Sequence, residues 1–296
     1  MSCSRRRHRD LRPPSCVKMP PTRSVMSMVD DSRIPVGQPT FRDGLAGSHV
    51  SPGDRCLLVV DAAQYDSNEV LATVYANDDD PHWCWLFENS TLKDHATAGP
   101  LVVETTADSK LVTAVNEHYA DSGLLYLFTR LPTTEALAGW RTALHGDLPE
   151  RGSCALRSYD SRFLTVINRV WPDWLASLIP MDMKCLWSVD WHDDLHWVQS
   201  LVSAGDKARP EPVWNERLEM SLGWADAWSR MQRLPGSSLE EGLRFIRHQC
   251  EAIVPCPDQD SELIGQWQAY VAYQTTDGTE RRSRGLNEKD VEPCQR

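Results

Sequence analysis

The sequence predicts an α/β protein in which a mixed or mainly parallel sheet is flanked by helices and followed by a smaller, all-helical lobe. Two observations lead to this prediction. Between Cys56 and Leu164, short apolar runs alternate with amphipathic stretches of roughly 10 to 15 residues, a pattern typical of sheets covered by helices. From about Trp197 onward the strand-like runs stop and helical patterns follow. We therefore expect two lobes of different architecture.

The first expected strand is the run CLLVV, which begins at Cys56. It is continuous, apolar and rich in β-branched residues, as in strands that are buried on both faces. A helix is expected over residues 66–76, and the runs WCWLFE and LVVET are the next expected strands, the latter directly after Gly99 and Pro100. The order strand, helix, strand is what indicates a parallel or mixed sheet.

The second half of the alternating region has the same character. In residues 109–121, apolar side chains recur at helical spacings, and Gly123 ends this helix before the strand LLYLFTR. A further amphipathic helix is expected after Thr133 or Thr134, followed by the strand CALRSY. Asp160 is placed to cap the next helix, DSRFLTVINRVW.

The C-terminal lobe is expected to contain three helices, over residues 213–232, 237–250 and 261–274. The second of them begins with a Ser-x-x-Glu capping box formed by Ser237 and Glu240. Its apolar positions repeat at helical spacing, so this helix should bury one face.

Both ends of the chain lack a regular pattern. Residues 1–30 carry seven Lys or Arg side chains against Asp10 and Asp30, a net charge of +5, and are rich in Pro and Ser. The chain is expected to divide into four segments: a disordered basic tail over residues 1–52, an α/β domain over 53–197, a helical lobe over 198–276 and a flexible C-terminus over 277–296.

Composition restricts the class of protein. The chain has 296 residues, a formal net charge of −11 and nine cysteines without CxxC spacing. An acidic chain argues against binding to nucleic acid backbones, and the odd set of cysteines indicates reduced thiols in the cytoplasm. No apolar run reaches the roughly 20 residues of a membrane span, and prolines interrupt the segment where an export signal would lie. We expect a cytoplasmic protein that binds neither nucleic acid nor membrane.

Five sequence words follow one another in the alternating region: LLVVDAAQY, WLFE, AGPLVVE, LYLFTR and LRSYDSRFL. Together they resemble the cargo-adaptor, or chaperone, domain of the bacterial type VI secretion system, over about half of the chain. The residues of interest within these words are Asp61, Tyr65, Gly99, Pro100, Arg157, Tyr159, Asp160 and Arg162. The chain departs from the family pattern at Ser158 and Ser161, where such adaptors carry an aromatic residue and a proline.

The resemblance implies a function. Such adaptors bind a toxic effector protein and hand it to the VgrG spike, without catalysis and without a cofactor. We therefore expect two protein partners, the cognate effector and the C-terminal region of VgrG. An immunity-like protein that neutralises an effector would also be acidic and bind a partner tightly, and it is a second hypothesis.

The last word places charged side chains around an expected helix start. Asp160 is expected to accept hydrogen bonds from free backbone N–H groups, and Arg157 to pair with it. Alternatively, Arg157 or Arg162 reaches a carboxylate of a partner protein through a bidentate contact. Asp61 and Tyr65, at the end of the first strand, allow the same two interpretations.

Tryptophan is unusually frequent, with twelve residues in the chain. Most of them should fill cores. Trp187, Trp191 and Trp197, however, lie where the α/β pattern gives way to the helical one. We expect them to line a groove between the lobes and to contact a protein partner.

An enzymatic alternative depends on His192 and His196. Their i, i+4 spacing would place two imidazoles one turn apart on a helix, as in zinc proteases. Asp193 stands where such enzymes have the glutamate that acts as general base, and no third ligand is evident, which favours a hydrated or capping cluster. The motifs GxSxG, GxxxxGK[ST] and GxGxxG are absent from the sequence. A metal-dependent hydrolase is therefore the alternative to a non-catalytic adaptor.

Overall fold

The structure, a computed structural model, describes most of the chain. The described residues are 54–148, 152–172, 175, 183–202 and 216–283. Contacts divide the chain into two compact units, Met1–Arg33 and Ile34–Arg296, and every described residue belongs to the second unit. The expected basic tail over residues 1–52 lies outside the described residues.

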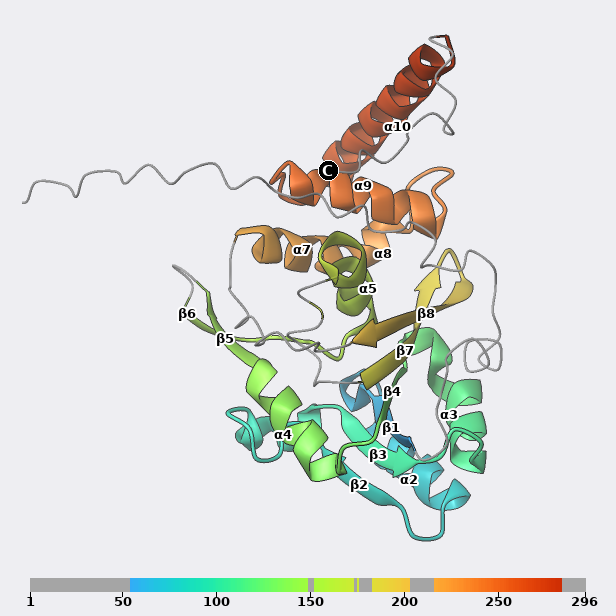
Figure 1. Ribbon diagram of the computed structural model, residues 1–296, viewed down its shortest axis with the longest axis vertical. Coiled ribbons are helices and arrows are strands. Elements are labelled where there is room, and N and C mark those ends of the chain that lie inside the picture. The colour runs from blue at the N-terminus through green and yellow to red at the C-terminus, as the bar shows by residue number, and fades with distance from the viewer. Residues whose placement is uncertain (1–53, 149–151, 173–174, 176–182, 203–215, 284–296) are drawn as a thin grey trace, which may run out of the picture. The chain divides into compact units, whose positions relative to one another are not determined.

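A six-stranded sheet forms the centre of the described structure (Figure 1). Its strand order is β2-β3-β1-β4-β7-β8, and every neighbouring pair is antiparallel. The prediction of a mixed or mainly parallel sheet is therefore wrong. The strands are β1 (Arg55–Val60), β2 (His82–Trp85), β3 (Leu101–Thr105), β4 (Leu125–Thr129), β7 (Met183–Trp191) and β8 (Asp194–Val202).

The error has a physical reason in the crossover connections. Helix α2 (Ser67–Asn77) connects β1 to β2, and both strands are antiparallel to β3, which lies between them. Helix α3 (Lys110–Tyr119) connects β3 to β4 in the same way on either side of β1. An alternating sequence pattern does not reveal that another strand is inserted between the two that a helix connects. The β-α-β-β-α-β order with interleaved strands is the ferredoxin-like arrangement.

Side chains of the sheet alternate between two cores, one on each face. In β1, Cys56, Leu58 and Val60 belong to one core, and Leu57 and Val59 belong to the other. All five are buried, which confirms the prediction of a first strand covered on both faces. Burial raises the pKa of the Cys56 thiol to about 12, so this cysteine stays protonated at neutral pH.

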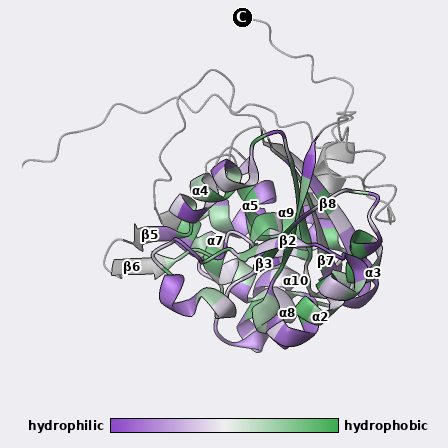
Figure 2. Ribbon diagram, turned by 90° about the horizontal axis from the view of Figure 1, so that it is seen from below, coloured by the Kyte–Doolittle hydropathy of each residue, from purple (hydrophilic) through white to green (hydrophobic). Residues whose placement is uncertain are grey.

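Helices cover both faces of the sheet. Val70 of α2 and Val115 of α3 belong to the core of Cys56. Trp140 of α4 (Thr133–Ala143) and Phe163 of α5 (Ser161–Val170) belong to the opposite core. In Figure 2 the helices carry both hydrophilic and hydrophobic stretches, as expected of helices with one buried face. A separate two-stranded sheet, β5 (His145–Leu148) and β6 (Gly152–Ala155), connects α4 to the segment before α5.

Within the part of the chain that the structure describes, four helices follow β8 and pack on the same core as α5. They are α7 (Glu216–Asp226), α8 (Trp228–Met231), α9 (Leu239–Glu251) and α10 (Asp260–Ser283). Trp224, Met231, Phe245 and Trp267 anchor one helix each in this core. Helix α5 contacts both α7 and α9, so it connects the sheet to the helical part (Figure 1).

The N-cap of helix α9 lies one residue later than predicted. Ser238 is the N-cap: its Oγ accepts a hydrogen bond from the N–H of Glu241 at 3.3 Å, and the Glu241 carboxylate accepts one from the N–H of Ser238 at 3.0 Å. Ser237 is buried, and its hydroxyl donates to the carbonyl of Leu234 at 3.0 Å. Two adjacent serines both have a glutamate three residues ahead, so the capping-box pattern alone does not choose between them.

Strands β7 and β8 are not among the elements that the sequence pattern predicts. They form a hairpin whose two turn residues, His192 and Asp193, have φ angles of 55° and 62°. Tight hairpin turns of this kind usually contain Gly or Asn, so the turn is hard to recognise. The predicted lobe boundary at Trp197 falls inside β8, and α10 continues past residue 277 to Ser283. The division into two lobes itself stays a prediction.

Two further observations concern the described residues alone. None of their helices combines the length and the apolar character that crossing a bilayer requires. Five of their cysteines are free thiols: Cys56, Cys84, Cys185, Cys250 and Cys256.

Candidate functional site

Charged residues from two distant sequence words meet between the end of β1 and the start of α5. Arg157 Nη2 lies 2.9 Å from Asp61 Oδ2 and 3.6 Å from Asp160 Oδ2. Arg162 binds Asp160 in a bidentate manner, with Nε 2.9 Å from Oδ1 and Nη2 2.6 Å from Oδ2. We call these four residues the Arg–Asp cluster.

Backbone groups hold the two carboxylates in place. Asp61 caps the short 3-10 helix Ala62–Gln64, and its Oδ1 accepts a hydrogen bond from the N–H of Ala63 at 3.3 Å. Asp160 is the N-cap of α5, and its Oδ1 accepts from the N–H of Arg162 at 3.0 Å, which confirms the predicted cap. The side chains of Asp61 and Asp160 are 5% and 9% exposed, whereas those of Arg157 and Arg162 are 47% and 39% exposed. Half-exposed guanidinium groups therefore cover buried carboxylates.

Opposing effects act on the pKa of Asp160. Burial raises this pKa, but the hydrogen bond and charge of Arg162 and the charge of Arg157 outweigh burial, and the net pKa lies below its ordinary value. Asp160 is therefore ionised at neutral pH. These contacts agree with the first of the two interpretations given above, in which Asp160 caps α5 and Arg157 forms an ion pair with Asp160. A contact of Arg157 or Arg162 with a partner protein stays a prediction.

Aromatic residues extend the cluster toward β2. The Arg157 guanidinium lies 5.7 Å from the centre of the Tyr159 ring, which packs edge-on against Phe87 at 5.8 Å. Phe87 in turn lies so close to Gly99 that a Cβ at this position would come within 2.5 Å of the ring. The carbonyl of Pro100 accepts a hydrogen bond from the N–H of Leu86 at 2.9 Å. Gly99, Pro100 and Tyr159 thus have structural roles beside the cluster.

Tyr65 lies elsewhere. Its ring packs edge-on against Tyr119 of α3, with 4.7 Å between the ring centres, on the side of the sheet that α2 and α3 cover. Tyr65 therefore packs against the core opposite to the one that contains Tyr159 and Phe163.

The three predicted groove tryptophans are buried. Trp187, Trp191 and Trp197 are 0%, 2% and 5% exposed. The first two belong to the core of α5, whereas Trp197 belongs to the opposite core. Trp187 Nε1 donates to Thr165 Oγ1 at 2.8 Å. The alternation of side chains along β7 and β8 places these indoles in the cores on either side of the sheet, so they do not line an open groove.

His192 and His196 do not lie on a helix, as the metal-site hypothesis requires. His192 lies at the turn of the β7–β8 hairpin, and His196 lies in β8, paired with Val189. His192 Nε2 is 3.1 Å from Ser237 Oγ. Within the described ranges, no group of three or more His, Cys, Asp or Glu is arranged to hold a metal ion. The helical i, i+4 geometry that motivated the hypothesis does not exist here.

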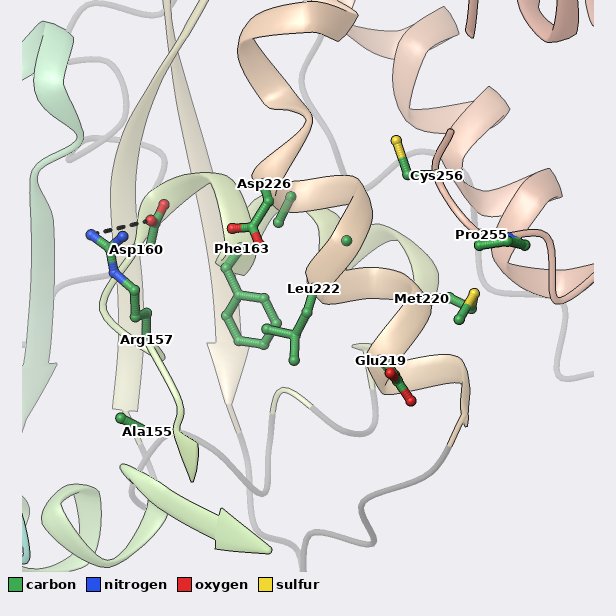
Figure 3. A pocket seen from close by; sticks show the side chains of 12 residues that line it. Ala155, Arg157, Asp160, Phe163, Glu219, Met220, Leu222, Asp226, Pro255 and Cys256 are labelled. Carbon is green, nitrogen blue, oxygen red and sulfur yellow. Dashed lines mark ion pairs between the residues drawn. The ribbon is translucent and has the colours of Figure 1, made fainter. Parts of the chain in front are cut away.

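A pocket of about 390 Å³ lies beside the Arg–Asp cluster (Figure 3). One wall comes from the end of β6 and the first turn of α5, and it includes Arg157, Asp160 and Phe163. The other wall comes from α7, and the segment after α9 contributes Pro255 and Cys256. We call it the α5–α7 pocket. The sequence pattern does not predict this pocket, because residues of its two walls are far apart along the chain.

The α5–α7 pocket combines apolar and acidic side chains. Phe163, Met220 and Leu222 provide apolar surface, and Asp160, Glu219 and Asp226 provide carboxylates. Burial raises the pKa of the Cys256 thiol to about 11, although Arg230 opposes this effect. Because the thiolate is the reactive form, Cys256 is a poor nucleophile.

Part of the chain matches a known protein family. Residues 56–176 match the family described as Domain of unknown function (DUF4123). This segment runs from β1 past α5 and contains the whole Arg–Asp cluster, whereas α7 lies beyond it. Searches of the curated proteins and of the solved structures found no match.

Proposed function

We propose that this protein is a non-enzymatic adaptor that binds a toxic effector protein and loads it onto the VgrG spike of a type VI secretion machine. The observation that carries the proposal is a convergence. The segment that matches the family contains every word of the resemblance, and the fold brings residues of the first and last words together in the Arg–Asp cluster. Because residues of the first and last words contact each other, these words belong to one structural unit, which supports the resemblance.

The use of the carboxylates supports binding over catalysis. General acid–base catalysis at neutral pH commonly uses a carboxyl group whose pKa is raised. The pKa of Asp160 is shifted in the opposite direction, and its oxygens accept hydrogen bonds from Arg162. The Asp61 carboxylate also accepts hydrogen bonds, from the side chains of Gln64 and Arg157. The cluster therefore stabilises the segment that matches the family.

The proposal is tested by co-purification. The tagged full-length chain is expressed with the effector encoded by a neighbouring gene and, separately, with the C-terminal region of VgrG. An adaptor is expected to retain both, and a VgrG that lacks its C-terminal region is the control that should not be retained. Retention of neither partner would overturn the proposal.

A second experiment separates loading from protection. Deletion of the gene for an adaptor is expected to abolish secretion of the effector while cells that express the effector survive. An immunity-like protein predicts the reverse, because its loss would kill cells that make the effector while secretion continues. Survival and secretion are measured in the same deletion strain.

A further inference from the structure

Strand β2 lies at one edge of the six-stranded sheet (Figure 1). The N–H of Leu86 donates to the carbonyl of Pro100 at 2.9 Å. Because bonded and non-bonded pairs alternate along an antiparallel ladder, the backbone groups of Trp83 and Trp85 face away from β3. The carbonyl of Trp85 accepts a hydrogen bond from Arg141 Nη2 at 3.0 Å, whereas no hydrogen bond within the described ranges engages the N–H and C=O of Trp83. A peptide that lies along this edge can therefore pair with Trp83.

Two aromatic side chains beside this edge reach the solvent. Tyr75, in the last turn of α2, is 55% exposed, and Trp83 is partly exposed. Trp83 Nε1 donates to Tyr75 Oη at 3.0 Å, and the Trp83 ring packs edge-on against Trp85 with 5.9 Å between the ring centres. These contacts hold the rings of Tyr75 and Trp83, which we call the aromatic pair, in fixed positions. Ordered, exposed aromatic rings are typical anchors for a protein partner.

The chain around the aromatic pair is negatively charged. Residues 66–92 contain six Asp or Glu side chains and no Lys or Arg. Asp78, Asp79 and Asp80 lie in the connection between α2 and β2, along the chain between the two members of the aromatic pair. Asp78 Oδ1 accepts a hydrogen bond from the N–H of Asp80 at 3.1 Å, and among the described residues none of the three aspartates forms an ion pair. A basic segment is therefore attracted to this loop.

The same features act against pairing between two copies of this chain. Strand β2 has only four residues, and the chain as a whole has a formal net charge of −11. Short edge strands beside charged residues discourage pairing between identical chains. A basic segment of another protein does not meet this repulsion, so a different protein fits this edge better than a second copy.

We infer that the edge of β2, with the aromatic pair beside it, binds an extended segment of the C-terminal region of VgrG in which a Lys or Arg follows an apolar residue. This inference rests on the adaptor function proposed above. The apolar side chain packs on the aromatic pair, and the cation lies near Asp79 and Asp80. The surface lies within residues 56–176, which match the family. Under the proposed function the spike is common to such adaptors, whereas the cargo differs between them, so a surface in this segment fits the spike.

The aromatic pair is tested by isothermal titration calorimetry of the full-length protein against the C-terminal region of VgrG. Tyr75→Ala removes an exposed ring and is expected to reduce the affinity for VgrG about tenfold. Tyr273→Ala is the matched control, because Tyr273 is 59% exposed and lies in α10, and it should leave this affinity unchanged. Both variants should bind the effector as wild type does. Urea denaturation checks that both are folded.

The charge requirement is tested separately. Asp79→Lys should weaken VgrG binding more at low than at high ionic strength, because salt screens the introduced repulsion. Asp258→Lys, at an exposed position after α9, is the control and should have a much smaller effect. Overlapping synthetic peptides from the C-terminal region of VgrG identify the bound segment. We expect that segment to lose affinity when its Lys or Arg is replaced by Gln.

Hydrogen exchange tests the backbone contact. Binding of the C-terminal region of VgrG should slow exchange of the Trp83 amide, which faces the open side of β2. The amides of His192 and Asp193, at the β7–β8 turn, should exchange as in the free protein. Exchange at Trp83 that VgrG leaves unchanged would show that the segment does not pair with this edge.

The outcomes distinguish the inference from the proposed function. VgrG affinity that is equal in Tyr75→Ala and Tyr273→Ala overturns the surface assignment and leaves the adaptor function standing. Loss of the effector with retention of VgrG in Tyr75→Ala also overturns it, as does a wild-type dimer that Tyr75→Ala converts to monomers. Wild-type protein that binds neither partner overturns the adaptor function itself. If Tyr75→Ala does not fold, Asp79→Lys and the peptide substitution decide the question.

Discussion

Arg157 Nη2 lies 2.9 Å from Asp61 Oδ2, and this ion pair joins the end of β1 to the loop before α5. The Asp61 carboxylate is almost fully buried, while half of the Arg157 side chain is in contact with solvent. Because the pair connects elements on distant parts of the chain, it holds α5 in place relative to the sheet. Helix α5 then supports α7 and α9.

Removal of the charge of Asp61 should destabilise the protein moderately. In Asp61→Asn the hydrogen bond from Ala63 can persist, but the charge that faces Arg157 is lost. We expect the free energy of unfolding to fall by about 1–2 kcal/mol, because solvent around Arg157 limits the effect. Urea denaturation measures it. Asp108→Asn, at an exposed position, is the control, and equal losses in the two variants would contradict the role of the pair.

Stability should depend on the ionisation of Asp160 at acidic pH. The pKa of Asp160 in the folded protein lies below its ordinary value, which is about 3.9. Its contribution to stability is therefore present above that ordinary value and is lost as the pH falls through the lower, folded pKa. Asn is also a good N-cap, so Asp160→Asn removes mainly the charge. Urea denaturation at pH 7 should show Asp160→Asn to be less stable than wild type, and this difference should shrink toward pH 3. A difference independent of pH would contradict the assignment.

Gly242 of α9 should not tolerate a side chain. A Cβ at this position would come within 2.6 Å of Cη2 and Cζ2 of Trp191, which is itself buried. We expect Gly242→Ala to lower the free energy of unfolding by about 1–3 kcal/mol, although alanine favours helices. Gly265→Ala in α10 has open space around it and should leave stability unchanged or raise it. Thermal unfolding of both variants tests the contrast, and a stabilised Gly242→Ala would show that the predicted contact is absent.

Trp187 should affect stability and not partner binding. The indole is fully buried, and its Nε1 donates to Thr165 Oγ1. Trp187→Ala is expected to lower the free energy of unfolding by about 3–5 kcal/mol. Trp83→Ala, at a partly exposed position on the edge strand β2, should have a smaller effect in the same urea titration. Loss of effector binding by a Trp187→Phe variant that unfolds like wild type would restore the groove hypothesis.

Several features could be predicted from the sequence because they depend on neighbouring residues. The burial of β1 on both faces follows from a continuous apolar run, and the cap of α5 follows from an aspartate before a helical pattern. The pattern also predicts helix α9 to within two residues, although two serines compete for its N-cap. Each of these depends on interactions within about one turn of helix or one strand.

Other features required contacts that no local pattern specifies. The alternation of side chains along a strand predicts which of them share a face of the sheet. It does not predict which strands are neighbours, and for this reason the antiparallel pairing could not be predicted from the sequence. The β7–β8 hairpin turns at His192 and Asp193, and because the sequence pattern does not reveal this turn, it does not place Trp187 and Trp191 in the core.

The sequence by itself determined the order of the elements from β1 to α4, the buried first strand, the cap of α5 and the words that resemble a secretion adaptor. These are properties of short segments, set by side-chain periodicity and local hydrogen bonding. The tertiary structure alone decided the pairing of the strands, the Arg157–Asp61 ion pair and the α5–α7 pocket. Each of these brings together residues that are far apart along the chain, and their proximity depends on how the whole chain packs.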